Sequence, residues 1–399
     1  MRIAVFGHKN IGTRESGVEV AVSELYERIG KTHEVTVYDR WVLPDKSKNE
    51  PNSKAPYEIK KAPTFKDGIV NTIFASFFAT LFCLFGGYDI VHVHSEEACF
   101  FLPLLKWKNV VVTVHGLDWQ NAMWGQFAKW YVKRCEKMIA KYADEIIVLS
   151  QGAQEYFRET YDRDTVVIPN GVSIKENNEI DKIQEHGIEP NDYILYVGRI
   201  SPEKRLDLLV NAYVASWRKE KLVIAGRLPD KLDNTLEFAK TQPNIILTGM
   251  VSGDLLDQLY THANLFVLPS DLEGQSISLL EALAHGLPCL ASDIPENVVA
   301  AGKYGHFFKA GNLQSLTEAL KQEDVLWVPD PDAQQKYVLE NHDWDDVATI
   351  TVGLYQSVMQ KKEKENDSED DEDENEDQEK EKSSPLDAVK NIIKKNKVT

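Results

Sequence analysis

The sequence is poor in cysteine and lacks any cysteine spacing that could begin a metal-binding motif. Its four cysteines, Cys83, Cys99, Cys135 and Cys289, are scattered and form no Cys-x-x-Cys pair. This pattern argues against a disulfide framework and a structural zinc site, and it is typical of the reducing cytosol. Residues 2–6 already have the pattern of an apolar strand, which argues against a signal peptide. We therefore expect a cytoplasmic protein.

Positive charge is also in short supply. The chain has 45 lysines and arginines against 63 aspartates and glutamates, a formal net charge of −18. Residues 363–381 hold 13 acidic and 2 basic side chains, a local charge of −11, so the remaining chain carries only −7. A mildly acidic body lacks the basic surface that phosphate backbones attract, so we expect no nucleic-acid partner.

The chain lacks an uncharged run long enough for a comfortable membrane span. Its most apolar stretch, Ile69 to Phe85, has 17 residues, no charge and five phenylalanines, and Asn71, Thr72 and Ser76 interrupt it. We expect a helix that is buried or lies beside a groove. The alternative is a helix that also contacts lipid at a membrane surface. A true span would remove a core helix from the first half of the chain.

Strand and helix patterns alternate along the chain, which predicts an α/β protein with parallel sheets. An apolar strand at residues 2–6 leads through a loop to Gly17, then to a helix near residues 18–29 and a second strand at 33–38. This order is Rossmann-like, but it lacks the Gly-x-Gly-x-x-Gly fingerprint of dinucleotide-binding proteins. Hydride transfer is therefore disfavoured. The length of 399 residues suggests two domains and a tail.

The most informative stretch is residues 268–297, which continue from an apolar strand at 265–268. A polar loop leads to a helix that begins at Ser276, a favourable N-cap residue. The free amides of the first turn make this loop a natural seat for a phosphate. Glu273 in the loop and Glu281 in the helix are out of place beside an anion unless they bind hydroxyl groups, as on sugar or ribose. The alternative is a pair of solvated carboxylates.

Three further side chains follow the carboxyl ends of predicted strands, where ligands bind in parallel sheets. Arg199 and Lys204 lie five residues apart after the strand at 193–197, and one forked and one compact cation suit a diphosphate. They could alternatively be ordinary surface charges. His115 follows the strand at 110–114, within reach of a ligand, although single histidines are usually structural.

The pattern Glu-Gly…Glu-Ala-x-Ala-x-Gly-x-Pro at residues 273–288 resembles the retaining GT-B glycosyltransferases of the family-four type, which use nucleotide-sugar donors. The resemblance implies that Glu273 faces the donor sugar and that Glu281 holds the ribose. Gly274, Gln275 and Ser276 then belong to the donor site as well.

Other motifs extend the resemblance. Arg199 and Lys204 match a basic pair that neutralises the donor's phosphates, although the glycine that usually follows the lysine is Arg205 here. The family's Gly-Gly beside the donor phosphate is Ser16-Gly17, so only Gly17 carries over. The histidine that contacts the donor sugar near the reacting carbon corresponds to His115. The residues that continue to Gly125 are similar to a subgroup of bacterial surface-polysaccharide transferases.

A GT-B fold is thereby implied, with two Rossmann-like domains whose parallel sheets face each other across a cleft. We expect an acceptor-side domain at residues 1–175 and a nucleotide-sugar donor domain at 176–343. A closing helix at 344–360 would pack back on the first domain. Residues 361–399 are expected to be a disordered, acidic, low-complexity tail that ends in a short basic amphipathic helix. That helix either docks on a partner or an anionic membrane, or it belongs to a tail that only aids solubility.

The implied function is sugar transfer from a nucleoside-diphosphate donor to an acceptor hydroxyl with retention of configuration. His115, Glu273, Arg199 and Lys204 are the expected catalytic residues. No strong general base is evident, so the leaving phosphate is expected to help deprotonate the acceptor. We expect a lipid-linked or glycan acceptor, and contact with the inner membrane surface through Ile69 to Phe85 or the C-terminal helix.

No metal or other cofactor is expected. Two Asp-x-Asp pairs, at residues 162–164 and 330–332, lie in loop-like contexts away from the relevant strand ends, and Arg199 and Lys204 suffice to neutralise a diphosphate. Two alternatives stay open. A 2-epimerase-like enzyme on the same fold would convert the donor without an acceptor, and a non-catalytic subunit of a transferase complex would bind the nucleotide sugar without turnover.

Overall fold

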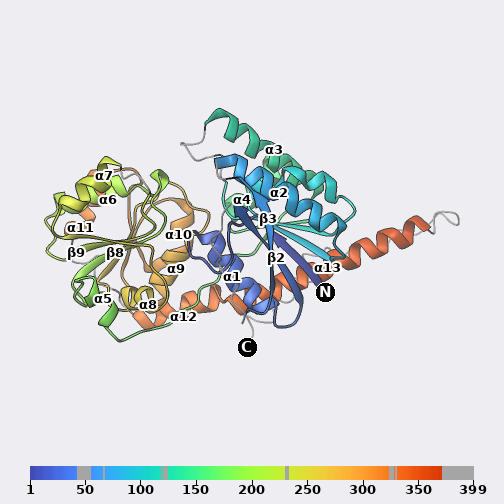
Figure 1. Ribbon diagram of the computed structural model, residues 1–399. Helices are drawn as coiled ribbons and strands as arrows, with labels where there is room; N and C mark the ends of the chain where they lie inside the picture. The colour runs from blue at the N-terminus through green and yellow to red at the C-terminus, as the bar shows by residue number, and fades with distance from the viewer. Residues whose placement is uncertain are drawn as a thin grey trace.

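Two parallel β-sheets, one in each half of the chain, form the frame of the protein. The computed structural model describes residues 1–42, 55–65, 68–117, 119, 125–229, 233–322, 328 and 330–370. The two sheets belong to two domains that lie next to each other, and the last helix of the described residues, Trp344–Asp370, packs on the N-terminal domain (Figure 1). This arrangement confirms the predicted fold of two Rossmann-like domains.

The N-terminal sheet has seven parallel strands in the order β3-β2-β1-β4-β5-β6-β7. Its strands are β1 (Arg2–Phe6), β2 (Glu34–Val42), β3 (Glu58–Thr64), β4 (Ile90–His94), β5 (Val110–Val114), β6 (Glu145–Val148) and β7 (Val166–Val167). Successive residues of a strand point to opposite faces, so Ile3 and Val5 enter one core while Ala4 and Phe6 enter another. Both faces of this sheet are therefore covered.

Helices on the two faces bury these cores. One face carries α1 (Gly17–Ile29) and the first part of α13 (Trp344–Asp370), which contact each other. The opposite face carries α2 (Gly68–Phe85), the 3-10 helix η1 (Glu96–Leu105), α3 (Gln126–Tyr142) and α4 (Gln151–Tyr161). Within the described residues, no helix combines the length and the apolar character that crossing a bilayer requires.

The C-terminal sheet has six parallel strands in the order β10-β9-β8-β11-β12-β13. Its strands are β8 (Tyr193–Val197), β9 (Lys221–Ala225), β10 (Ile245–Gly249), β11 (Leu265–Leu268), β12 (Cys289–Ser292) and β13 (Gly305–Phe308). The surrounding helices are α5 (Asp181–Glu185), η3 (Pro202–Lys204), α6 (Leu206–Ser216), α7 (Asn234–Thr241), α8 (Asp254–Thr261), α9 (Ile277–Ala284), α10 (Pro295–Ala301), η4 (Gly302–Tyr304), α11 (Leu313–Lys321) and α12 (Pro331–Asn341). A single apolar core holds this domain together.

Each sheet reverses its strand order at one point, between β1 and β4 in the first and between β8 and β11 in the second. Ligands of open α/β sheets bind outside the carboxyl ends of the strands at such points. The backbone is tightly packed there: a Cβ on Gly7, which follows β1, would lie 1.8 Å from the carbonyl oxygen of His94, and the residue has a φ of +111°. Only glycine fits, and the chain can then turn into the cleft.

The chain crosses between the domains twice, and the two crossings lie side by side. The amide of Val172 donates to the carbonyl of His342 at 2.7 Å, and Val172 pairs with Asp343 in a parallel bridge. A Cβ on Gly171 would lie 2.5 Å from the ring of Trp344. Residues 171–172 and 342–344 therefore form one compact junction between the domains.

The structure differs from the sequence prediction at the end of α13. The predicted helix ended at residue 360, with a charged linker from 361 onward, yet α13 continues to Asp370. Lysine and glutamate are good helix formers, and Lys362 binds Asp144 at 2.9 Å on the N-terminal domain, so the helix gains a contact beyond the predicted end. Residues 371–399, with the predicted C-terminal helix, and residues 120–124 lie outside the described residues.

Candidate active site

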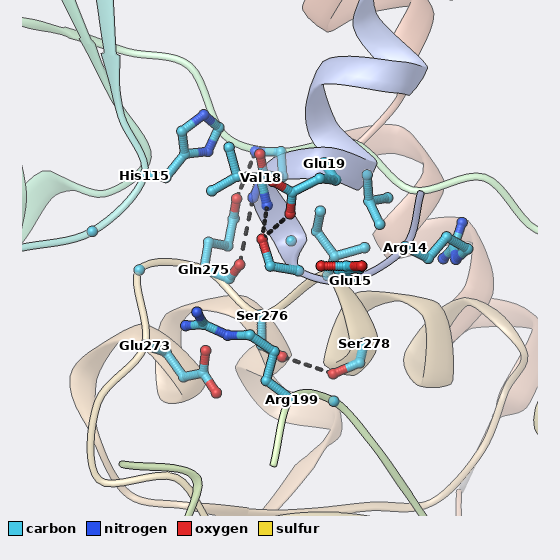
Figure 2. Close-up of a pocket in the computed structure, with 18 of the residues that line it drawn as sticks. Arg14, Glu15, Val18, Glu19, His115, Arg199, Glu273, Gln275, Ser276 and Ser278 are labelled. Atoms are coloured by element: carbon cyan, nitrogen blue, oxygen red, sulfur yellow. Dashed lines mark hydrogen bonds between the residues drawn. The ribbon is translucent and has the colours of Figure 1, made fainter. Parts of the chain in front are cut away.

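A cavity of about 410 Å³ lies between the two domains at the carboxyl ends of their strands. It is lined by all nine residues that the sequence assigned to the site, namely Gly17, His115, Arg199, Lys204, Glu273, Gly274, Gln275, Ser276 and Glu281. Figure 2 shows His115 above Glu273 on one side of the cavity, with Arg199 beside Glu273, and Arg14 on the other side. The structure therefore brings these nine residues together at one cavity, while their roles stay predictions.

The start of α9 forms part of the cavity wall. The hydroxyl of Ser276 accepts a hydrogen bond from the amide of Leu279 at 3.3 Å, which makes Ser276 the N-cap, as predicted. Ile277 packs against the N-terminal core, so this helix end is held at the domain boundary. The positive end of the helix therefore faces the cavity, where an anion is favoured.

Lys204 and Glu273 form an ion pair inside the cavity. The ammonium group of Lys204 donates to both carboxylate oxygens of Glu273, at 2.6 and 2.7 Å. Their side chains are only 14% and 6% exposed, so the pair is shielded from solvent. Arg205, which stands where the family usually has glycine, takes a left-handed conformation with a φ of +52° and binds Asp271 at 2.7 Å. Arg205 thus takes a backbone conformation that glycine adopts readily.

Arg199 is held less firmly than Lys204. Its guanidinium lies 3.5 Å from a carboxylate oxygen of Glu203 and is exposed to the cavity, while its backbone carbonyl accepts a hydrogen bond from Tyr196 at 2.8 Å. A fixed backbone and an exposed guanidinium suit a residue that contacts a ligand in the cavity. Within the described ranges, no three side chains of the types that ligate metals gather into a site.

His115 ends a chain of buried hydrogen-bonding rings that crosses the N-terminal domain. Its Nε2 lies 3.0 Å from Nδ1 of His94, whose Nε2 lies 3.0 Å from the hydroxyl of Tyr26. That hydroxyl is 2.7 Å from Nδ1 of His92, which the hydroxyl of Tyr355 on α13 approaches to 2.6 Å. The orientation of His115 is therefore set by its neighbours.

Burial makes all three imidazoles weak bases. It lowers the pKa of His115 to about 4 and that of His92 to about 3, and it holds the pKa of His94 well below its usual range. The cause is the loss of hydration that a charged ring would suffer in this interior. The rings are neutral at neutral pH, so His115 offers the cavity a fixed hydrogen-bonding group rather than a permanent charge.

Among the cavity residues that the sequence prediction did not name are four charged side chains, those of Arg14, Glu15, Glu19 and Arg227. Arg14 reaches across the cleft to Glu281, and Arg227 of the second domain reaches back to Glu15. Glu19 accepts a hydrogen bond from the backbone amide of Lys9 at 3.0 Å. Only Glu19 carried a usable signal, because Ser16 followed three residues later by Glu19 is a capping box. The two ion pairs join residues more than 200 positions apart, which no local pattern reveals.

Two contacts with backbone atoms of the N-terminal domain, made by Gly274 and by the side chain of Gln275, fix the separation of the domains at the cavity. A Cβ on Gly274 would lie 1.7 Å from the carbonyl oxygen of His115, so the two loops touch and only glycine fits between them. The side-chain oxygen of Gln275 accepts a hydrogen bond from the amide of Asn170 at 2.6 Å. Gln275 therefore joins the domains in this structure, and its predicted contact with the donor would have to be made from that position.

Two facing Rossmann-like domains with a polar cavity between their strand ends define the GT-B class. Family comparisons agree. Residues 16–176 match Glycosyltransferase Family 4, and residues 191–322 match Glycosyl transferases group 1. The two matches cover nearly three quarters of the chain, and the chain belongs to these GT-B glycosyltransferases. The resemblance predicted from residues 273–288 is thereby confirmed at the level of the family.

Individual relatives are more distant. The chain is 30% identical over 255 residues to the putative teichuronic acid biosynthesis glycosyltransferase TuaC of Bacillus subtilis, an alignment that spans 61% of this chain and 63% of the relative, less than two thirds of its length. Sucrose-phosphate synthase from Thermosynechococcus elongatus superposes with a TM-score of 0.78 at 18% identity, covering 90% of this chain and 98% of that one. The structure of Anabaena HepE in complex with UDP-glucose superposes with a TM-score of 0.72 at 15% identity, covering 90% of this chain and 100% of that one. Such identities show the fold alone.

Proposed function

We propose that this protein transfers a sugar from a nucleoside-diphosphate donor to a hydroxyl of a lipid-linked or glycan acceptor, with retention of configuration, in bacterial surface polysaccharide or glycoconjugate synthesis. One observation carries the proposal. Arg199, Lys204, the N-terminus of α9 and Glu281 share one wall of a cavity, and His115 faces them from the other domain. This is the set of groups that a diphosphate, a ribose and a sugar together require.

The charge distribution suggests where each part of the donor lies. The diphosphate would sit between Arg199, Lys204 and the positive end of α9, where three sources of positive potential meet. The ammonium of Lys204 has three donors, so it can keep Glu273 and still reach a phosphate oxygen. Glu281, farther along α9, would bind the ribose hydroxyls. The sugar would then lie between His115 and Glu273.

The reaction breaks the bond between the anomeric carbon and the diphosphate oxygen and forms a bond from that carbon to the acceptor oxygen. The bonding electrons leave with the diphosphate, whose growing charge Arg199 and Lys204 would stabilise. The acceptor's proton would pass to the departing phosphate oxygen. Attack from the face that the leaving group vacates gives retention. We expect all of this to proceed without a metal ion.

The relatives support the proposal without extending it. The name of TuaC supports polysaccharide synthesis, and the UDP-glucose complex of HepE supports a nucleotide-sugar donor on this fold. Neither specifies the sugar, the base or the acceptor of this chain. A donor screen is therefore the first experiment.

We expect one nucleoside diphosphate among UDP, GDP, ADP and dTDP to raise the melting temperature, because a ligand that binds only the folded state stabilises it by mass action. Glu281→Ala should weaken its binding roughly ten- to hundredfold, since hydrogen bonds to a charged group are lost. Calorimetric titration measures the affinity. Glu237→Ala on α7, an exposed carboxylate of the same domain, is the matched control.

Turnover then separates the alternatives. With the matching nucleotide sugar and an acceptor, EDTA-resistant transfer with a retained anomeric configuration in the product supports the proposal. Conversion of the donor alone would indicate an epimerase, and tight binding without turnover would indicate a non-catalytic subunit. No stabilisation by any nucleotide would remove the donor-site assignment.

We also propose that the N-terminal domain contacts an anionic membrane through α2 and α3. The face of α2 that packs on the sheet is made of small or polar side chains, while Phe74, Phe82 and Phe85 are turned outward, Phe85 with 84% of its surface exposed. A helix that buries its small residues and exposes its large apolar ones is unusual for a surface in water. This arrangement supports the predicted lipid contact of Ile69 to Phe85.

Helix α3 adds a charged stripe beside it. Its exposed residues recur at helical spacing, with two aromatic residues followed by three cations, and they are Phe127, Trp130, Arg134, Lys137 and Lys141. Helix η1 contacts both α2 and α3, so the three helices form one continuous side of the domain. Cations beside exposed aromatic rings, on a protein of net charge −18, match anionic lipid headgroups.

The protein is expected to co-sediment with vesicles that contain phosphatidylglycerol and not with pure phosphatidylcholine vesicles, and salt should weaken the binding. Lys137→Glu with Lys141→Glu should reduce binding at least tenfold, because two attractions of about 1 kcal/mol each become repulsions. The matched control is Lys240→Glu on α7, an exposed lysine of the other domain. Equal sedimentation of both variants, or none with anionic vesicles, would contradict the membrane contact.

A further inference from the structure

Two consecutive residues of the loop before α1 form ion pairs of opposite polarity across the cleft. The guanidinium of Arg14 pairs with the carboxylate of Glu281 in the C-terminal domain. The carboxylate of Glu15 pairs with the guanidinium of Arg227 in the same domain. We call these two pairs the Arg14–Glu15 clasp. Both pairs line the cavity, and Figure 2 shows Arg14 and Glu15 on the side away from His115.

Glu281 has no oxygen left without a partner in this state. Tyr260, which is buried, donates its hydroxyl to Oε2 at 2.9 Å, and Arg14 occupies Oε1. The glutamate side chain is only 10% exposed. Because Tyr260 is buried in the C-terminal core, the oxygen that faces the cavity is the one that Arg14 covers. Oε1 can accept a second hydrogen bond, but the carboxylate is mostly buried and Arg14 covers its cavity side, so a ligand that needs this carboxylate competes with the guanidinium.

We propose that Arg14 competes with the donor's ribose for Glu281, so that the clasp is an autoinhibitory contact that donor binding releases. The inference rests on the proposed function, since it takes Glu281 as the ribose ligand. Ribose hydroxyls would replace the guanidinium at Oε1, while Tyr260 would keep its hydrogen bond to Oε2. The displaced Arg14 would still be attracted by Glu24, and the Glu15–Arg227 pair would still join the domains on this side of the cleft.

The competition predicts that removal of the Arg14 cation from the binding site increases the affinity for the nucleotide. Arg14→Ala should bind the matching nucleoside diphosphate roughly three- to tenfold more tightly than the wild type, because a partly buried ion pair no longer has to be broken. The 2′,3′-dideoxy form of the same nucleotide lacks both ribose hydroxyls and does not need Glu281. Its affinity should be the same for both proteins. Calorimetric titration of both ligands measures the two effects.

The controls separate this competition from other roles of the residue. Arg14→Lys keeps the charge and should behave closer to the wild type, and Arg158→Ala on α4, an exposed arginine outside the cleft, should change neither affinity. Weaker binding of both nucleotides by Arg14→Ala would make Arg14 a phosphate ligand and overturn the proposal. Unchanged binding of both would overturn it as well. If the wild type binds neither nucleotide, the proposed function itself fails.

Discussion

Replacement of Lys204 by alanine is expected to lower kcat/KM about 100- to 1,000-fold, the usual loss when one group that stabilises a developing negative charge is removed. Two effects act in the same direction. The diphosphate loses a cation as its charge grows, and Glu273, only 6% exposed, loses the ammonium group that lies 2.6 Å away. The uncompensated carboxylate then repels the donor. Steady-state kinetics with the matching donor measures the change.

The control for this experiment is Lys240→Ala, which removes an exposed lysine of the same domain and should leave kcat/KM unchanged. The melting temperature of Lys204→Ala should be lower than that of the wild type, because Glu273 stays buried without its partner, so the kinetics are compared well below the unfolding transition of the variant. Turnover of Lys204→Ala within threefold of the wild type would contradict its assigned role.

Replacement of Gly274 by alanine is expected to reduce turnover at least about 100-fold, because a displacement near 1 Å at the reacting groups is enough for such a loss. The new methyl group would lie 1.7 Å from the carbonyl oxygen of His115 and 3.1 Å from Cα of Gly116. These are backbone atoms, so no change of rotamer relieves the overlap. The two domains must move apart, and His115 must retreat from Glu273.

Small-angle X-ray scattering can follow this separation as an increased radius of gyration, and kinetics can follow the loss of turnover. Gly152→Ala on α4 is the matched control, since this exposed helical glycine has only the hydroxyl of Ser150 nearby, at 4.0 Å. It should be neutral or slightly stabilising. Wild-type turnover and dimensions of Gly274→Ala would show that the loops do not set the domain separation.

The sequence was most informative where function depends on short segments. A strand, a turn and a helix start lie next to one another in the chain, so Lys204 and Ser276 could be assigned to strand ends before their positions in space were known. The structure brings them into one cavity because parallel strands place their carboxyl ends at the same edge of each sheet.

The sequence was uninformative where function depends on contacts between distant segments. Arg14 and Glu281 are far apart in the chain, and neither belongs to a pattern that requires the other. The rings that orient His115 likewise come from α1, β4 and α13. The end of α13 was misplaced for another reason. Its charged residues carry no apolar pattern, and their attachment to Asp144 depends on the tertiary fold.

Helix α13 also determines when the N-terminal domain can complete its folding during synthesis. Trp344, Tyr355 and Val358 belong to the core on one face of its sheet, yet they follow the entire second domain in the chain. When β7 leaves the ribosome, these residues have not yet been synthesised. Until they are, one apolar face of the N-terminal domain stays uncovered, and His92 has no hydrogen bond to the Tyr355 hydroxyl. The first domain to leave the ribosome is therefore the last to be completed.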